Sequence, residues 1–410
     1  MSNARSRIVN LALAAGSLAL VLLASLAVDR IYGVVAPPVA LPNTMELIFP
    51  PNARQSFKSI EFAYEAHINR LGLRERDPAP KRPGVFRICA LGDSYTYGWG
   101  VNAEQTWLRL LEEKLKAEGL EVETINLGKP GSGPDFYSDL ARRALPLLEP
   151  DLVIVGILMG NDIIATAPAG VEADKLGVTL AESLYPNIVR ALRRPAVPEG
   201  ERTTEVPPQV STAEDNVNWT RNTAQSFLEK MSAEERVRYG QIDERVRTAF
   251  EAGLFNPYMV DLALKSPETY QHTLRLDDPW IEQCIQAVSD HLRIIAEAAS
   301  SVDAPTVVAV LPDGPYVNDH ALQGIQRVGY KMPPDAADSD GPDQAVRETA
   351  SRAGLPVISA TAAFKARRGE PGFYFELDGH MTPKGHALFA EAIAPEVARL
   401  VREAGGGAQP

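Results

Sequence analysis

The stretch FRICALGDSYTYGWGV, residues 86–101, predicts a buried strand that leads directly into a serine. It begins as an apolar run with β-branched members, the composition of a strand covered on both faces. Gly92, Asp93 and Ser94 follow, and a helical pattern begins at Glu104. Open α/β sheets place their chemistry at this carboxyl edge, where the turn exposes the Ser94 hydroxyl. The competing interpretation is a tight turn in which Asp93 and Ser94 only cap the next helix.

Strand and helix patterns alternate around this stretch. Continuous apolar runs predict strands, and one-sided apolar stripes predict helices. The short connections predict a doubly wound parallel sheet with right-handed crossovers. Residues 316–343 are rich in Gly, Pro and Asp, which predicts a long loop. The predicted strands are 85–91, 122–127, 152–158, 306–311 and 355–358, and the predicted helices 106–115, 136–148, 280–299, 344–353 and 383–401.

Residues 165–278 break the alternation and contain few strand signals. They combine a proline-rich patch at 195–208 with mixed-charge helical stretches such as 232–250. An insertion of this size after a sheet strand is usually a lid, a cap or a partly disordered loop. Aromatic residues in and just after it either line a substrate groove or, more commonly, form a small local core: Trp219, Tyr239, Tyr258, Tyr270 and Trp280.

The amino terminus predicts a membrane-targeting segment. Arg5 and Arg7 precede an uncharged run over residues 8–28. As a helix this run spans about 31 Å, one hydrocarbon core, and the arginines before it place the start in the cytoplasm. The sequence SLA at 25–27 resembles a cleavage site, which would make the segment a removable signal peptide. Its length favours an uncleaved anchor.

Composition completes the predicted organisation. The 410 residues carry a formal net charge of −12 without a Lys/Arg block, which argues against a nucleic-acid partner. Two cysteines, Cys89 and Cys284, are too few for a disulfide framework and are expected in the core. No Cys/His cluster has metal-ligand spacing. The predicted parts are a signal anchor or signal peptide (1–30), a proline-bearing stalk and linker with at most an edge strand (31–84), an α/β domain in two parts (85–164 and 279–403), the insertion (165–278) and a disordered tail (404–410).

Four short stretches contain the side chains that hydrolytic chemistry requires. A serine hydroxyl becomes nucleophilic when a histidine removes its proton, and a carboxylate on the other ring nitrogen orients that histidine. The developing oxyanion needs fixed donors, for which the N–H groups of Gly131 and Ser94 and the Asn161 amide are candidates. Three stretches follow parallel strands and converge on one edge, and the last can fold back over it. The stretches are GDS (92–94), NLGKPGSGP (126–134), GND (160–162) and DGHMTPKGH (378–386).

These stretches resemble the conserved blocks of the SGNH (GDSL-type) hydrolase superfamily. The string INRLGLRERDPAPKRPGVFRICALGDSYTYGWGV, residues 68–101, resembles a bacterial branch with an amino-terminal membrane segment. The likeness covers the chain from there to the last helix, except the insertion. It implies a flavodoxin-like three-layer α/β/α sandwich with a parallel sheet and no metal or organic cofactor. By position it implies Ser94 as nucleophile, Gly131 and Asn161 as the oxyanion hole, and His380 as general base oriented by Asp378.

Two positions depart from the family pattern. The family usually has glycine two residues before the oxyanion-hole asparagine, where this chain has Met159. The last block is usually Asp-x-x-His, whereas Asp378 lies two residues before His380. This spacing resembles the Asp-x-His of some polysaccharide O-acetyltransferase relatives, which keeps acyl transfer open beside hydrolysis.

Other polar residues have structural interpretations. His386 is expected to pack at a helix start, and Asp93 and Asp162 to accept hydrogen bonds from loop backbone. No role is assigned to the histidines outside the blocks, which are His67, His272, His291 and His320.

Together with the resemblance, the sequence predicts a membrane-anchored serine esterase on the extracytoplasmic (periplasmic) face, or a secreted one if the first segment is cleaved. Its substrate would be an acylated small molecule or glycan. One alternative is an O-acetyltransferase acting on an envelope or exported polysaccharide. The other is a non-catalytic glycan-binding scaffold that keeps the fold.

Overall fold

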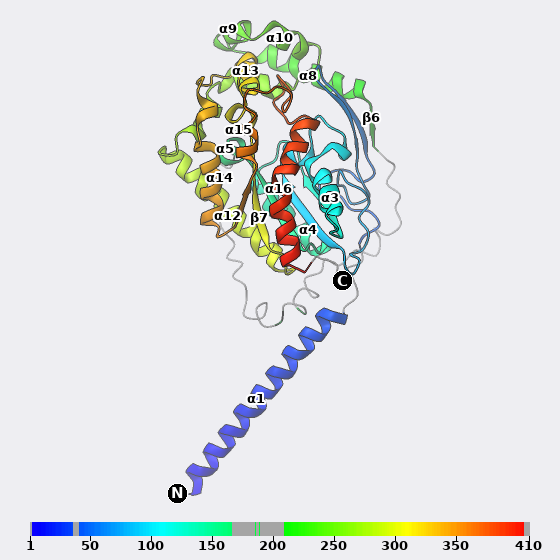
Figure 1. Ribbon diagram of the computed structural model, residues 1–410, viewed down its shortest axis with the longest axis vertical. Coiled ribbons are helices and arrows are strands. Elements are labelled where there is room, and N and C mark those ends of the chain that lie inside the picture. The colour runs from blue at the N-terminus through cyan, green and yellow to red at the C-terminus, as the bar shows by residue number, and fades with distance from the viewer. Residues whose placement is uncertain (1, 36–40, 166–184, 186–187, 189–208, 406–410) are drawn as a thin grey trace.

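The protein is an α/β body preceded by one long helix. A computed structural model describes residues 2–35, 41–165, 185, 188 and 209–405. Helix α1 (Ser2–Val35) is drawn as a rod outside the body (Figure 1). It contains a 20-residue segment, Leu13–Tyr32, that is long and apolar enough to cross a membrane. Its length and composition therefore fit a membrane anchor or a signal sequence.

The body is organised on a five-stranded sheet in the order β4-β3-β5-β7-β8, with every pair parallel. In chain order this is 2-1-3-4-5, the flavodoxin-like arrangement, so the predicted fold class is confirmed. Every residue of β3, β5 and β7 is buried, because these strands are covered on both faces. The strands are β3 (Phe86–Gly92), β4 (Val122–Gly128), β5 (Leu152–Leu158), β7 (Thr306–Leu311) and β8 (Val357–Ser359).

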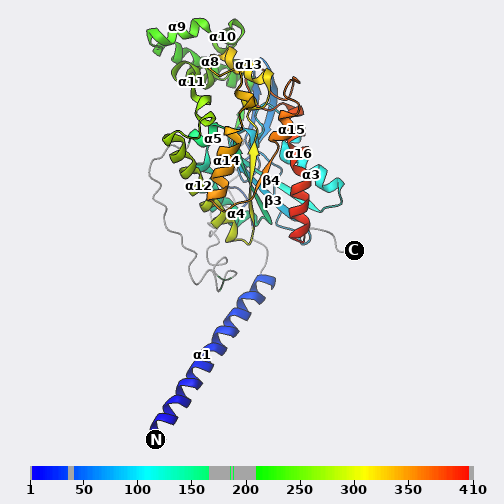
Figure 2. The same ribbon diagram turned by 60° about the vertical axis from the view of Figure 1, so that its left-hand side comes forward.

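Helices cover both faces of this sheet. Helix α12 packs against α4 and α14, and α16 packs against α3, so the two groups form the outer layers (Figure 2). Each strand and helix lies within three residues of its predicted bounds. The helices are α3 (Trp107–Ala117), α4 (Pro134–Leu148), α12 (Pro279–Ser300), α14 (Gly341–Arg352) and α16 (Pro383–Glu403).

The predicted spacer ahead of the sheet is folded instead. The N–H groups of Leu47 and Phe49 donate to the carbonyls of Leu71 and Gly72, and Leu47 and Leu71 are buried in the main core. Strands β1 (Arg54–Lys58) and β2 (Ala63–His67) pair antiparallel, and β6 (Val210–Ser211) adds to β1 in parallel. The extended-spacer interpretation is therefore wrong for residues 41–51, whereas the expected edge strand is present as β2. The apolar residues of this part of the chain are too irregularly spaced to give a periodic signal, and β6, the parallel partner of β1, lies far along the chain.

The predicted loop at 316–343 contains a helix, α13 (Asp319–Val328). The Asn318 side chain caps its first turn by accepting the N–H groups of His320 and Ala321, and Gly329 ends it in the left-handed region. Gly324 in its middle weakened the helical signal. That glycine is required by packing, because a Cβ there would overlap the carbonyl oxygen of Glu376.

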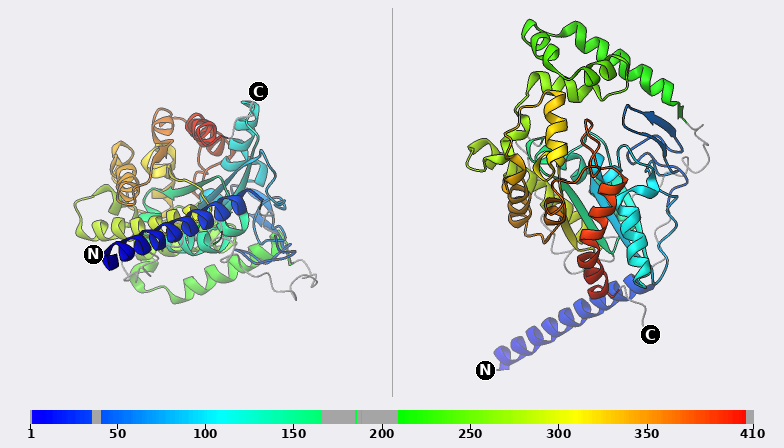
Figure 3. Two further views of the ribbon diagram at one scale, coloured as in Figure 1. Left: turned by 90° about the horizontal axis from the view of Figure 1, so that it is seen from below. Right: turned by 45° about the horizontal axis from the view of Figure 1, so that its top comes forward.

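The described part of the insertion is mostly helical. The helices begin at capping side chains: Thr212, Ser232, Asp243 and Asn256 each accept a backbone N–H of the first turn. Helices α8 to α10 lie at the end of the body opposite α1 (Figures 1 and 3). The proline-rich patch and most of the tail lie outside the described residues. The helices are α8 (Ala213–Lys230), α9 (Ala233–Gln241), α10 (Glu244–Glu251) and α11 (Pro257–Lys265), followed by the 3₁₀ turn η3 (Thr269–Leu274).

Candidate active site

Ser94 begins a short helix at the switch point of the sheet. Strand β3 ends at Gly92, Asp93 caps α2 (Ser94–Tyr97), and the Asp93 carboxylate accepts the Tyr95 N–H at 2.9 Å. Gly92 permits the tight turn, since a Cβ there would overlap the Thr96 side chain. Asp93 therefore caps the helix, and the half-buried Ser94 lies where the strand order reverses between β3 and β5.

The loop before α16 brings His380 and Asp378 to this serine. The Nε2 atom of His380 lies 2.8 Å from Ser94 Oγ, and its Nδ1 atom lies 2.5 Å from Asp378 Oδ1. Asp378 is buried, whereas the His380 side chain is 15% exposed. The Asp-x-His spacing works because Gly379 adopts φ +81°, which turns both side chains toward one side. Hydroxyl, imidazole and carboxylate thus form one hydrogen-bonded line.

The electrostatic environment of His380 favours its protonated form. Burial by itself lowers the pKa of His380, but the carboxylates of Asp378, Asp93 and Asp313 oppose this and raise it above its ordinary value. The Asp378 carboxylate is the strongest of the three and also bonds the ring directly. This arrangement stabilises an imidazolium, which a histidine that accepts a serine proton must become.

Gly131 and Asn161 follow the strands on either side of β3. Gly131 lies in the loop after β4 with φ +70°, and Asn161 begins α5 (Asn161–Ala165) directly after β5. Both residues are exposed, so their donors can meet a bound molecule. Met159, at the departure from the family pattern, is buried, and its carbonyl accepts the Asn161 N–H at 3.1 Å.

Two aspartates of the predicted stretches support loops, as expected. Asp162 accepts the Leu158 N–H at 2.8 Å and the Tyr137 hydroxyl at 3.1 Å. Burial raises the pKa of Asp93 to about 6 and that of Asp162 well above its usual value. These carboxylates hold the turns after β3 and β5.

Histidines outside the site pack or bond elsewhere. His386 is buried in α16, its Nδ1 accepts the Trp107 N–H at 3.2 Å, and burial lowers the pKa of His386 to about 3. The packing interpretation is therefore confirmed. Contacts of the others are His67 with Glu65, His272 with Trp280, His291 with Ser138, and His320 with the Gly369 carbonyl.

Sequence reasoning missed Asp313, which follows β7 and Pro312 at the same sheet edge. The Tyr95 hydroxyl lies 3.1 Å from Asp313 Oδ1 and 2.8 Å from the carbonyl oxygen of Gly379. The Tyr95 hydroxyl has one proton and can donate it to only one of these two oxygens. If it donates to the Gly379 carbonyl, a protonated Asp313 can donate to the Tyr95 oxygen, and both contacts are then hydrogen bonds. Burial raises the pKa of Asp313 to about 7, which favours that form. The available signal was its place just after a buried strand, shared with the turn that holds Ser94.

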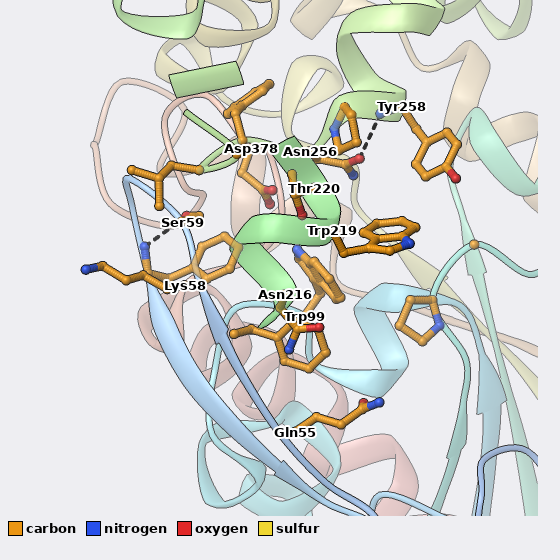
Figure 4. Close-up of a pocket in the computed structure, with 18 residues that line it drawn as sticks. Gln55, Lys58, Ser59, Trp99, Asn216, Trp219, Thr220, Asn256, Tyr258 and Asp378 are labelled. Carbon is orange, nitrogen blue, oxygen red and sulfur yellow. Dashed lines mark hydrogen bonds between the residues drawn. The ribbon is translucent and has the colours of Figure 1, made fainter. Parts of the chain in front are cut away.

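A cleft of about 620 Å³ borders the triad geometry, and both Gly131 and Asp378 line it. Its walls come from the β1–β2 hairpin, the loop after α2, and helices α8 and α11 of the insertion (Figure 4). Trp219 and Tyr258 are each 56% exposed there, with ring centroids 6.4 Å apart. These two therefore line a groove, whereas Tyr239, Tyr270 and Trp280 pack against the main core.

Over the residues that the structure describes, no group of three or more His, Cys, Asp or Glu side chains could hold a metal ion.

Comparison with known proteins indicates a GDSL-like domain over part of the chain. The sequence model of the GDSL-like lipase/acylhydrolase family matches residues 90–262, which include Ser94, Gly131 and Asn161. No curated protein matches the chain. Similar solved structures include TesA (11% identity, 77% of this chain and 99% of that chain, TM-score 0.35), a G-D-S-L family protein from Desulfitobacterium hafniense (14%, 75% and 98%, 0.34) and a lipase/acylhydrolase from Enterococcus faecalis (14%, 77% and 96%, 0.34).

The family match includes Ser94 and both candidate oxyanion donors and ends before Asp378 and His380. The four sequence stretches occur in the family's order, and the sheet has the strand order that the resemblance implies. Over residues 90–262 the chain therefore resembles the GDSL-like hydrolases of the SGNH superfamily.

Proposed function

We propose that the protein is a serine-dependent ester hydrolase that works through an acyl-enzyme at Ser94. The observation that supports this most directly is the line from Ser94 Oγ to His380 Nε2 (2.8 Å) and from His380 Nδ1 to Asp378 Oδ1 (2.5 Å). Nucleophile, base and orienting acid within hydrogen-bond reach are the arrangement that serine catalysis needs.

In the first half-reaction, Ser94 Oγ attacks the ester carbonyl while His380 Nε2 accepts the hydroxyl proton. Asp378 accepts the Nδ1–H bond and stabilises the imidazolium. The tetrahedral oxyanion receives hydrogen bonds from the N–H groups of Ser94 and Gly131 and from the Asn161 amide. The intermediate then collapses: the ester C–O bond breaks, and His380 returns its proton to the leaving alcohol.

In the second half-reaction, a water molecule replaces the alcohol. His380 removes one proton from this water as it attacks the acyl carbonyl, and the same donors stabilise the second oxyanion. Collapse breaks the bond between the acyl carbon and Ser94 Oγ, and His380 reprotonates the serine. The products are a carboxylic acid and the free enzyme.

The deciding experiment is active-site labelling of the full chain with a fluorophosphonate, followed by peptide mapping and turnover of an aryl acetate. We expect the label on Ser94, and both labelling and turnover lost in Ser94→Ala. Ser301→Ala, which removes an exposed hydroxyl at the end of α12, is the matched control and should behave as wild type. An unlabelled wild type that binds glycan would instead support the scaffold alternative.

Acyl transfer to an alcohol other than water is a second candidate, favoured by the cleft beside the triad geometry. Its volume of about 620 Å³ and its amide side chains, Gln55, Asn216 and Asn256, suit a polar acceptor next to the acyl-enzyme. To decide between hydrolysis and acyl transfer, glycan acceptors are added to an assay of aryl acetate turnover. Acetylated glycan in excess of free acetate would identify a transferase.

We further propose that α1 anchors the catalytic body to a membrane from the extracytoplasmic, periplasmic side. The support is the 20-residue apolar segment Leu13–Tyr32 and the two arginines before it. Fractionation with carbonate extraction, plus protease protection of intact spheroplasts, tests this. We expect a membrane-bound chain whose body is digested from the periplasmic side. A shortened, soluble chain would indicate cleavage.

A further inference from the structure

Glu61 lies at the tip of the β1–β2 hairpin, a part of the chain that none of the four motif stretches includes. The tip is held in one conformation by Ser59, whose Oγ accepts the N–H groups of Glu61 at 3.0 Å and Phe62 at 3.2 Å. The Ile60 N–H donates to the Leu254 carbonyl at 3.0 Å, which ties the tip to the insertion. The Glu61 side chain therefore extends from a braced turn.

The Glu61 carboxylate accepts two successive backbone N–H groups of the loop that holds Asp378. The Leu377 N–H lies 3.1 Å from each carboxylate oxygen, and the Asp378 N–H lies 2.7 Å from Oε2. Hydrogen bonds to an ionised acceptor are about twice as strong as neutral ones. Two of them on adjacent peptides fix both the position and the rotation of the backbone from which the Asp378 side chain extends.

This contact is made against an electrostatic cost. Burial raises the pKa of Glu61, and the neighbouring Asp378 carboxylate raises it further, whereas the two N–H donors and Arg245 oppose the shift. A half-buried carboxylate beside a second carboxylate is unfavourable unless its hydrogen bonds offset the desolvation. The available offset comes mainly from the Leu377 and Asp378 amides.

The loop itself is a compact turn that would transmit a shift to the site. The Phe375 N–H donates to the His380 carbonyl at 2.9 Å, and the Gly379 N–H donates to the Phe375 carbonyl at 3.1 Å. The Phe62 ring, next to Glu61, packs on Phe375 with centroids 4.9 Å apart. Moving the Leu377–Asp378 peptides would therefore displace the Asp378 carboxylate from His380 Nδ1.

From these contacts we infer that Glu61 is a positioning residue for catalysis: its carboxylate, through the Leu377 and Asp378 amides, holds Asp378 in register with His380. The inference rests on the proposed function, because it concerns the same serine chemistry. Glu61 touches no reacting atom, so its loss should lower kcat and leave substrate binding unchanged.

The test compares Glu61→Gln with wild type and with Glu65→Gln, a neighbouring carboxylate on β2 whose side chain is 69% exposed. A glutamine of equal size offers one acceptor oxygen and an NH₂ group that repels the facing N–H donors. We expect kcat and the Ser94 labelling rate of Glu61→Gln to fall about 10- to 100-fold with KM within about twofold. Hydrogen exchange at the Leu377 and Asp378 amides should become faster. Glu65→Gln should match wild type in all four measurements.

If Glu61→Gln does not fold, Glu61→Asp and Ser59→Ala test whether Glu61 positions Asp378. The first keeps the charge but withdraws it by one methylene, and the second loosens the tip without removing the carboxylate. We expect each to lower kcat less than Glu61→Gln would, in the same direction. Wild-type kcat in the folded variants, or a rise in KM alone, would overturn the inference.

The two proposals can fail separately. A wild type without Ser94 labelling contradicts the proposed function, whereas normal labelling of both wild type and Glu61→Gln contradicts only the positioning role. Amide exchange at Leu377 and Asp378 does not depend on turnover. Unchanged exchange in folded Glu61→Gln would therefore refute the contact itself.

Discussion

The two sheets of this molecule are built in opposite ways. In the five-stranded sheet, β3, β5 and β7 are buried along their whole length and every pair is parallel. In the three-stranded sheet, β2 alternates between buried and exposed residues, and β6 comes from within the insertion. The first presents Ser94, Gly131 and Asn161 at one rigid edge. The second, with the insertion, forms walls of the cleft beside that edge.

This difference suggests a division of labour. Changes at the edge of the parallel sheet should alter the chemical step, and changes in the cleft walls should alter substrate binding. Glu61 is an exception to this division, because it lies in the hairpin of the smaller sheet but is proposed to affect kcat. The following variants test the division, from the largest expected effect to the smallest.

Asp378→Asn should have the largest effect. The amide cannot stabilise an imidazolium and presents an NH₂ group to His380, so kcat should fall by about 10³- to 10⁴-fold. The measurement is single-turnover acylation by an aryl ester. Asp340→Asn, which removes an exposed carboxylate paired with Lys365, is the control and should retain activity. A loss below tenfold would contradict the assignment of Asp378 as orienting acid.

Asn161→Ala should come next. Removal of one oxyanion donor costs about 10²- to 10³-fold in kcat where such donors act in the transition state. KM should stay near wild type, because a ground-state carbonyl gains little from that donor. Asn218→Ala removes the same amide from the exposed face of α8 and serves as comparison. If the Asn161 variant changed KM and spared kcat, Asn161 would belong to substrate binding.

Asp313→Asn should change the pH dependence of stability. Burial raises the pKa of Asp313 to about 7, from 3.8. The folded protein therefore binds this proton more tightly than the unfolded chain, and stability from it is lost as pH rises from about 4 through 7. An asparagine does not titrate. Between pH 5 and 8, urea unfolding should show the variant gaining roughly 2–3 kcal/mol relative to wild type.

The control for that series is Asp340→Asn, which removes an exposed carboxylate paired with Lys365. Its stability relative to wild type should stay flat over the same pH range. A flat difference for Asp313→Asn as well would show that Asp313 is ionised in the folded protein, and the proton chain through Tyr95 to Gly379 would then be wrong.

Trp219→Ala should have the smallest effect. The side chain is 56% exposed in the wall of the cleft, so melting temperature and kcat should change little. Loss of one aromatic contact should raise KM about 3- to 10-fold for esters large enough to reach α8. The KM for a small aryl acetate should be unaffected, which makes that substrate its own control. A fall in kcat instead would break the proposed division.

The difference between the two sheets also explains which parts of the fold the sequence predicts. Strands such as Leu152–Leu158 are continuous apolar runs, so their position and parallel arrangement are visible locally. The hairpin pairs polar strands such as Arg54–Lys58, and its third strand lies beyond α5 in the chain. Helix Asp319–Val328 was missed because Gly324 serves a tertiary contact that no local pattern records.

The sequence likewise predicted some residues of the candidate site and missed others. Family resemblance supplied Ser94, Asp378 and His380 as a set, but no sequence pattern gives the distances among them. Asp313 was missed although it occupies a predictable place after a strand. Glu61 could not have been found, because its contact with Asp378 joins positions 317 residues apart. Residues that act through backbone amides leave no motif.

The two thiols have a practical consequence. Cys89 lies in the inner strand β3 and Cys284 in α12, both unpaired and fully shielded from solvent. Folding this chain therefore requires no oxidant and no disulfide exchange, in whichever compartment it occurs. A thiol-reactive dye can reach Cys89 only when strand β3 separates from the sheet. The rate at which the dye modifies Cys89 therefore reports how often the native state opens globally.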